Sequence, residues 1–415
     1  MRTCIAITVI IGLLAAQAAG EWPSFHGPRR DNRSTETGLL KAWPADGPKL
    51  RWTAAGLGKG YSSVTIAGGL IYTAGMTDKR TYVIALDPNG AEKWRRLNGR
   101  SWETTLRYAM AYGGARATPT YDEGRLYHLG ETGRLACLDA NSGSELWTLD
   151  LFERFDAKTP KYGLAESVLI DGDRLICSPG GAKGYIVCLD KNTQRLIWAN
   201  TEIKGDTGYS SPVIAEFGGF RQILSVNAKA VFAVDANDGR LLWSVPHENM
   251  RQNNVADPIF HKGHVYASSG YGRGSILIRL KADGKEIKTE QAWASKLMDN
   301  HHGGVVLVDG YLYGSGHQSQ GWFCLEFMTG GQAWNAKGKG SLTYAEGMLY
   351  CLDENGTMAL VEATPKAHRL VSSFRVPKGG TGLYWAHPVV CGGRLYVRHT
   401  DKLFAYDIRK SPPQP

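Results

Sequence analysis

The feature that most constrains the fold of this chain is an internal repeat. Eight times, a turn that contains glycine leads into a short apolar or aromatic strand. The copies read AGGLIYTAG, DEGRLYHLG, DGDRLICSP, GGFRQILSV, HKGHVYASS, VDGYLYGSG, AEGMLYCLD and CGGRLYVRH. They recur about every 46 residues, which is the length of one four-stranded blade of a β-propeller.

A second pattern follows most of these copies. It consists of an apolar-Leu-Asp strand end, a turn usually holding glycine, and a tryptophan about eight residues after the aspartate, as in ACLDANSGSELW. Glycine supplies the positive φ of a tight hairpin, and the aspartate accepts backbone N–H groups in the turn. Runs such as 83–86 are apolar on both faces, and the tryptophan is a large apolar plug. Each unit is therefore a small sheet that needs a neighbour on either side.

The two ends of the repeat region complement each other. The eighth copy begins at Gly393 and stops after Asp407 without a tryptophan strand, whereas KLRWTA at 49–54 is such a strand without the rest of its unit. We therefore predict that Lys49 to Ala54 pairs beside Leu403 to Asp407. Closing the ring in this way removes exposed sheet edges. Blades five and seven should be irregular, because LIRLKADGKEIKTE lacks a tryptophan at the expected place and the seventh unit ends on Phe374.

The predicted fold is accordingly all-β: an eight-bladed β-propeller of four-stranded antiparallel blades, closed by an N-terminal strand that completes the last blade. It occupies residues 49–410, between an N-terminal extension at 21–48 and a tail at 411–415. Residues 1–20 have the basic start, short apolar run and small residues of a signal peptide cleaved near Gly20–Glu21. The alternative is an uncleaved single-pass anchor, for which the apolar run is short.

Charge and cysteine usage bound the environment. The net charge of +9 comes from scattered Lys and Arg, so we expect no nucleic-acid partner. We expect an exported monomer, periplasmic or extracellular, with no permanent transmembrane anchor. Of seven cysteines, the six that follow Cys4 lie mostly in apolar strand-like runs, as small buried residues do. Cys177 and Cys188 flank one hairpin, and the sequence leaves open whether they form a disulfide.

The L-D-x-x-x-G-x-x-x-W units resemble the pyrroloquinoline-quinone (PQQ) repeat of eight-bladed quinoprotein dehydrogenases, and they equally resemble the repeats of the BamB outer-membrane assembly factor. The best matches are Asp139/Gly143/Trp147, Asp235/Gly239/Trp243 and Glu326/Gly330/Trp334. The segments WPSFHGPRRDNRSTETGLLKAWPADGPKLRW, NHHGGVVLVDGYLYGSGH and YWAHPVVCGGRLYVR are similar to a family of exported PQQ-binding-like propeller proteins. The resemblance implies the fold and carries no settled activity.

The loops that enter the first strand of each blade should gather at one mouth of the central channel. They contain Tyr61 to Ser63, Arg116 to Thr118, Glu166-Ser167, Tyr209 to Ser211, Asn254 to Asp257, His301 to Gly303, Ser341 and Trp385 to His387. A mouth lined with polar groups is a candidate binding site. The candidate catalytic residues are Glu166, Asp257 and Arg116. The candidate cofactor-binding residues are Tyr61, Arg116, Glu166, Tyr209, Asn254, Asp257, His302, Trp385 and His387.

Each of these residues also has a structural interpretation. Small side chains at the strand starts relieve crowding at the axis, aromatic residues pack, and charged residues form salt bridges across the channel. Adjacent residues of an extended strand point to opposite faces, so we expect only one of His301 and His302 to face the channel. A metal site is therefore not predicted.

Three functions are compatible with this pattern. The first is a non-catalytic scaffold that binds a small ligand at the channel mouth or a protein partner. The second is a PQQ-dependent oxidoreductase for alcohols or sugars, with PQQ and calcium as cofactors. The third is a polysaccharide hydrolase or lyase. The chain has no adjacent cysteine pair, which the resemblance to quinoprotein dehydrogenases would imply, and it is shorter than those enzymes. We therefore favour the first function, for which no cofactor is required.

Overall fold

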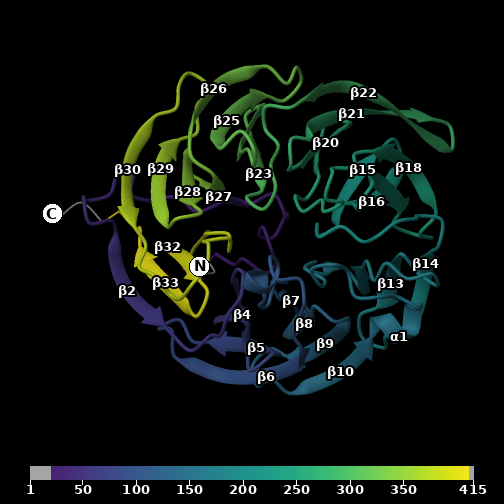
Figure 1. Cartoon of the computed structure of the whole chain (residues 1–415), viewed down its shortest axis with the longest axis horizontal. Coiled ribbons are helices and arrows are strands. Elements are labelled where there is room, and N and C mark those ends of the chain that lie inside the picture. The colour runs from purple at the N-terminus through teal and green to yellow at the C-terminus, as the bar shows by residue number, and fades with distance from the viewer. Residues whose placement is uncertain (1–19, 411–415) are drawn as a thin grey trace, which may run out of the picture.

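A computed structural model describes residues 20–410 of the chain. Its strands form eight sheets arranged in a ring around a central axis (Figure 1). Seven sheets have four strands, and one gains a fifth short strand from the N-terminal extension. The predicted eight-bladed β-propeller is confirmed. The predicted signal peptide and the tail lie outside the described residues, apart from Gly20. No helix within residues 20–410 is long and apolar enough to cross a membrane.

In blades 1 to 7 the four main strands run from the axis to the rim in chain order. Blade 1 comprises β3 (Thr65–Ala67), β4 (Leu70–Thr77), β5 (Arg80–Leu86) and β6 (Glu92–Arg100); blade 2 comprises β7 (Thr120–Asp122), β8 (Arg125–Leu129), β9 (Arg134–Asp139) and β10 (Glu145–Asp150). Blade 3 comprises β11 (Leu169–Asp171), β12 (Arg174–Cys177), β13 (Ile186–Asp190) and β14 (Leu196–Asn200); blade 4 comprises β15 (Val213–Phe217), β16 (Phe220–Val226), β17 (Ala230–Asp235) and β18 (Leu241–Pro246). Blade 5 comprises β19 (Ile259–His261), β20 (His264–Ser269), β21 (Gly274–Asp283) and β22 (Glu286–Ser295); blade 6 comprises β23 (Val305–Val308), β24 (Tyr311–Ser315), β25 (Gly321–Glu326) and β26 (Gln332–Lys337). Blade 7 comprises β27 (Gly340–Ala345), β28 (Met348–Asp353), β29 (Thr357–Glu362) and β30 (Leu370–Arg375). Short helical turns α1 (Leu151–Phe155) and η1 (Met110–Tyr112) lie between blades.

Blade 8 is built from both ends of the chain. Its first three strands are β31 (Val389–Cys391), β32 (Arg394–His399) and β33 (Lys402–Asp407), and its fourth is β2 (Lys49–Ala54). β2 pairs antiparallel with β33, so that Lys49 lies opposite Asp407 and Ala54 opposite Leu403. The predicted closure of the ring is therefore confirmed. Every blade now has a neighbour on both faces, and the first and last blades share no open edge.

The tryptophans of the repeat link most blades to the next. In six blades the indole N–H donates to a backbone carbonyl of the following blade, over 2.7–3.2 Å. In four of these contacts the turn glycine of the following blade lies against the indole ring. Gly143, for example, has a φ of 69°, and a Cβ atom there would lie 2.5 Å from the Trp94 ring. Glycine is thus required both by the turn and by the close approach of the ring.

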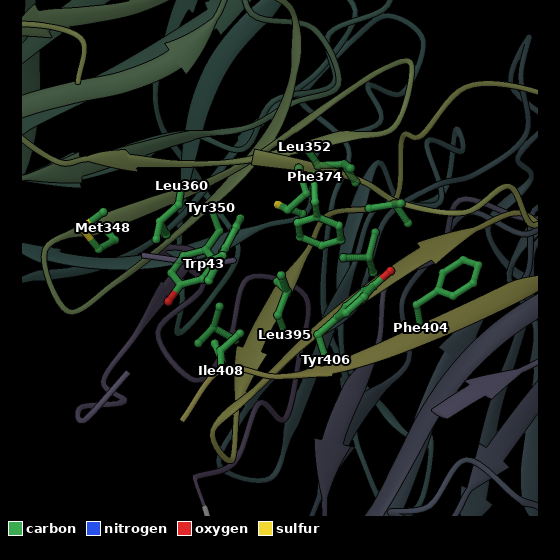
Figure 2. Close-up of a cluster of buried hydrophobic side chains, with 14 of the residues drawn as sticks. Trp43, Met348, Tyr350, Leu352, Leu360, Phe374, Leu395, Phe404, Tyr406 and Ile408 are labelled. Carbon is green, nitrogen blue, oxygen red and sulfur yellow. The ribbon is translucent and has the colours of Figure 1, made fainter. Parts of the chain in front are cut away.

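Blades 5 and 7 also place a tryptophan ring beside the next blade, although their sequences depart from the repeat. In blade 5 a longer hairpin delays the tryptophan, and Trp293 of β22 donates to the Phe327 carbonyl at 2.9 Å. In blade 7, Ser372 follows the strand bulge where other blades have tryptophan. Trp43 of the N-terminal extension fills this place, 5.8 Å from the ring of Tyr350 and 5.4 Å from that of Phe374 (Figure 2). The extension therefore supplies the aromatic residue that blade 7 lacks.

The N-terminal extension crosses the centre of the ring (Figure 1). Trp22 bonds Ile66 of blade 1, and the Arg30 guanidinium donates to the Pro212 carbonyl beside blade 4 at 3.1 Å. Further on, β1 (Arg33–Ser34) pairs parallel with β27 of blade 7. These bonds satisfy backbone groups that face the axis. The sequence indicated no role for this segment, which in the structure runs across the central axis and contacts blades on different sides of the ring.

The six cysteines among the described residues are all buried and free. Cys177 lies opposite Val187, and Cys188 lies opposite Ile176, so the two cysteines occupy adjacent positions of the β12–β13 pair. Adjacent positions point to opposite faces, and the two side chains enter different hydrophobic clusters. The disulfide that the sequence left open is not formed.

Candidate ligand site at the channel mouth

A cavity of about 330 Å³ lies where the loops entering the eight inner strands converge. Its wall contains the sequence-predicted Tyr61, Arg116, Tyr209, Asp257, His302, Trp385 and His387. Phe25 and His26 of the extension also line it. The cavity is therefore a cup whose wall is formed by the blade loops together with part of the extension. It falls within the size range of small-molecule sites, at the lower end.

The inner loops present their side chains to the cavity at alternate positions. Arg116 and Thr118 line it, as do Ala165 and Ser167, whereas the residues between them do not. Extended chains have this period of two. The same loops also carry a series of hydrogen bonds that link neighbouring blades. The backbone N–H of Ser63 donates to Thr118 Oγ1, that of Thr118 to Ser167 Oγ, that of Ser167 to Ser211 Oγ, and that of Ser211 to Asp257 Oδ1, over 2.6–3.1 Å.

These bonds change the interpretation of the small residues at the strand starts. The sequence analysis explained them by crowding at the axis. In the structure, the hydroxyl groups also join blades 1 to 5 through a continuous series of hydrogen bonds. Asp257 ends that series, so its carboxylate has a structural role as well as a place in the cavity wall.

Glu166 does not line the cavity, because it occupies the position between Ala165 and Ser167. Both of its carboxylate oxygens lie 3.1 Å from the backbone N–H of Ser178, which donates to them. Burial raises the pKa of Glu166 to about 8, and the nearby guanidinium of Arg30 opposes that shift. This candidate is thus buried inside blade 3, facing away from the site.

Asn254 is likewise buried outside the cavity wall. Its side-chain amide donates to the Asn227 carbonyl at 2.8 Å and to the His247 carbonyl at 2.9 Å. Its side-chain oxygen accepts from Asn249 and from Ser269. The residue holds three loops together, and no polar atom of its side chain is left for a ligand.

Asp257, His26 and His387 form a chain of contacts on the cavity floor. His387 Nε2 lies 2.6 Å from the His302 carbonyl, and His387 Nδ1 lies 2.9 Å from His26 Nε2. Burial lowers the pKa of His387 to about 3, so this imidazole is neutral and donates to the carbonyl. His26 Nε2 must then be the donor to His387. His26 Nδ1 lies 3.2 Å from Asp257 Oδ2. This contact brings the extension against the loop that enters blade 5.

Arg116 lines the cavity while its guanidinium binds the neighbouring loop. It donates to the Gly114 carbonyl at 3.1 Å and to the Tyr112 carbonyl at 2.6 Å, and it lies over the Trp102 ring. Burial lowers its pKa. These contacts indicate that Arg116 orders the loop at 101–119. The guanidinium N–H groups that do not bond this loop are available to the cavity.

The aromatic part of the wall is larger than the sequence predicted. Trp385 is sandwiched between Tyr112 and His302, whose ring centroids lie 5.3 and 4.2 Å away, and its indole donates to Glu354. Tyr112, Tyr162 and Tyr271 also line the cavity and were not predicted. They lie in loops and turns away from the strand starts, so a search by repeat position misses them. Their only sequence signal is an aromatic residue beside glycine or proline-rich turns.

Both adjacent histidines line the cavity, which corrects the expectation that only one would do so. The reason is that residues 301–303 form a bend, and β23 begins only at Val305. The His301 and His302 ring centroids lie 3.9 Å apart, and His317 lies 5.0 Å from His301. Burial lowers the pKa of all three imidazoles.

The donor set of the wall was compared with the needs of a calcium-bound quinone. Calcium takes six to eight oxygen ligands, mostly carboxylates and carbonyls. The wall contains one carboxylate, that of Asp257, which already accepts from Ser211 and lies beside His26. Within residues 20–410, no group of three or more His, Cys, Asp or Glu side chains is placed to hold a metal ion. These residues do not fit the ion site of such a cofactor.

Eight four-stranded blades around a ligand-sized cup define the chain as a β-propeller of the PQQ-repeat class. The sequence profile of one family in this class, described as outer membrane protein assembly factor BamB, matches residues 79–336. The chain belongs to this family. No curated protein matches the sequence significantly.

Solved structures share the fold at low sequence identity. BamB from Moraxella catarrhalis has a TM-score of 0.60 and 15% identity, with 87% of this chain and 99% of that chain covered. A europium-containing methanol dehydrogenase has a TM-score of 0.68 and 12% identity, covering 92% and 89%. Quinohemoprotein alcohol dehydrogenase from Comamonas testosteroni has a TM-score of 0.65 and 12% identity, covering 95% and 82%. At these identities the likeness concerns the fold alone.

Proposed function

We propose that this protein is a non-catalytic binding propeller that holds a small molecule in the cup at its channel mouth. The observation that carries the proposal is the cup itself, in which loops from around the ring and the N-terminal extension converge on one cavity of about 330 Å³. Aromatic rings and a few polar groups line it, as in known small-molecule sites. Among the three functions considered, a ligand-binding scaffold needs no further residues.

The engagement of the candidate acids supports binding over catalysis. A general acid or base must reach the reacting atom within hydrogen-bond distance. Glu166 faces the Ser178 amide, away from the cavity. One oxygen of Asp257 accepts the Ser211 amide, and the other lies 3.2 Å from His26 Nδ1 without a hydrogen bond, so the wall offers a single carboxylate oxygen for chemistry. The contacts of these two carboxylates argue equally against the hydrolase or lyase, which requires a pair of them at the substrate. A protein partner bound over the same mouth remains compatible with a binding propeller.

We also propose that the protein works after export, as a monomer in the periplasm or outside the cell. The signal-peptide pattern of residues 1–20 supports this.

The proposal is tested by filling the cup. Ala165→Phe places a ring in the cavity wall, and Ala333→Phe adds the same group on the exposed rim strand β26. A fragment library screened by ligand-observed NMR should give hits for the wild-type protein that are lost in Ala165→Phe and kept in Ala333→Phe. Hits that survive in Ala165→Phe, or a library without saturable binding, would overturn the proposal. PQQ with calcium forms a separate arm, in which dye reduction by an alcohol or sugar would establish the oxidoreductase instead.

A further inference from the structure

One side of the cup holds three imidazoles that have no partner in the protein. Within residues 20–410, the side chains of His301, His302 and His317 make no hydrogen bond to another residue, and the Nδ1 atom of each is buried without a partner. His301 is only 4% exposed. Buried polar atoms are nearly always paired in folded proteins. Three unpaired imidazoles in one cavity wall therefore indicate a group that the chain itself does not provide.

The charged groups around these imidazoles are already balanced. The Lys339 ammonium, which also lines the cup, lies 3.1 Å from Glu354, and Glu354 accepts the Trp385 indole N–H at 2.8 Å. Asp299, behind His317, accepts the backbone N–H groups of Gly272 and Gln318. Both nearby carboxylates are thus engaged by other groups, and neither hydrogen-bonds an imidazole. Arg251 lies outside, over the Tyr271 ring.

We propose that His301, His302, His317 and Lys339 form an oxyanion site, which takes the carboxylate or phosphate group of a small ring-bearing molecule. This inference rests on the proposed function. The wall offers N–H donors from an ammonium and from imidazoles, and its natural complement is a group that only accepts hydrogen bonds. Aromatic side chains, including Tyr271 and Trp385, line the rest of the cup and suit a ring.

The electrostatics predict proton uptake on binding. Burial lowers the pKa of His301, His302 and His317, and neighbouring histidines and the Lys339 ammonium lower it further, so these imidazoles are neutral when no anion is bound. A negative charge placed against them favours the imidazolium and raises their pKa. The bound state therefore holds more protons than the free state, and affinity for the anion increases as the pH falls.

Isothermal titration calorimetry with matched arenes tests the assignment. Benzoate, phenyl phosphate and benzamide share a ring and differ in the head group, so benzoate and phenyl phosphate distinguish a carboxylate site from a phosphate site. At least one of the two anions should bind about tenfold more tightly than neutral benzamide, consistent with a charge-assisted hydrogen bond. Titration in buffers of different ionisation enthalpy should show net proton uptake.

A variant pair separates this site from the fold. His317→Gln keeps a polar side chain that cannot be protonated, and it should weaken anion binding several-fold and reduce the proton uptake. His368→Gln alters a histidine that packs on Trp334, away from the cup, and should change neither. Equal affinities for anions and benzamide would leave the cup a ligand site and overturn the oxyanion assignment. Failure of every arene, together with a failed fragment screen, would overturn both proposals.

Discussion

Replacing Trp43 tests whether the N-terminal extension completes blade 7. The side chain is 6% exposed and packs against Tyr350 and Phe374. A buried indole removes about 150–250 Å² from water, which at about 25 cal/mol per Å² stabilises the fold by about 4–6 kcal/mol. Its Nε1 donor is buried without a partner, which costs about 1–3 kcal/mol. Trp43→Ala should therefore lower the free energy of unfolding by about 3 kcal/mol.

The unpaired donor makes a sharper comparison possible. Trp43→Phe keeps a ring and removes that donor, so it should cost less than about 1 kcal/mol. Trp334→Phe removes a donor that bonds the Thr364 carbonyl at 2.7 Å, and should cost about 1–2 kcal/mol more than Trp43→Phe. Urea denaturation followed by far-UV circular dichroism gives all three values. The reasoning is refuted if Trp43→Ala costs no more than the exposed-residue control Leu146→Ala, or if the two phenylalanine variants are equal.

Three further outcomes follow from the structure. Burial raises the pKa of Glu166 to about 8 in the folded state, so the folded chain keeps a proton that the unfolded chain loses. The free energy of unfolding should therefore fall as the pH rises from about 4.5 to 8. Glu166→Gln should remove this pH dependence and raise the free energy of unfolding at pH 8 by on the order of 1–3 kcal/mol, as measured by urea unfolding at several pH values. In Gly143→Ala the new Cβ clashes with the Trp94 ring and the residue also keeps a positive φ, whereas in Gly219→Ala the φ is positive but the Cβ has open space. Gly143→Ala should therefore lower the melting temperature more than Gly219→Ala does. Equal decreases would show that backbone strain alone matters. The six buried cysteines should resist a thiol reagent in the native protein and react together on unfolding, whereas rapid labelling of any one would contradict their burial.

The sequence predicted the ring well because its signals are local. Each Gly-turn, Asp and Trp reports on one hairpin or one blade contact, and the split between Asp407 and Trp52 was enough to predict the closing strand. The site was predicted only in part, because its remaining members come from long-range contacts. No repeat pattern shows that His26 reaches His387, or that Trp43 substitutes in blade 7.

Two sets of side chains point in directions that the sequence did not predict, for a specific physical reason. Glu166 belongs to a predicted mouth loop, yet the period of two turns it away from the cavity. Conversely, His301 and His302 both line the cavity because the chain bends there and the period is interrupted. Position in a loop was therefore a good guide to proximity, whereas the direction of a side chain depended on local backbone geometry.

The path of residues 20–54 makes assembly of the molecule depend on both chain ends at once. This segment contacts blades 1, 4 and 7 and then completes blade 8, which cannot exist until residues 389–407 have been made. A chain interrupted before those residues leaves β2 without its pairing strand β33 and the facing sides of blades 1 and 7 uncovered. Completion of the far end thus acts as a checkpoint, since only a chain that reaches it can lock the segment that came before.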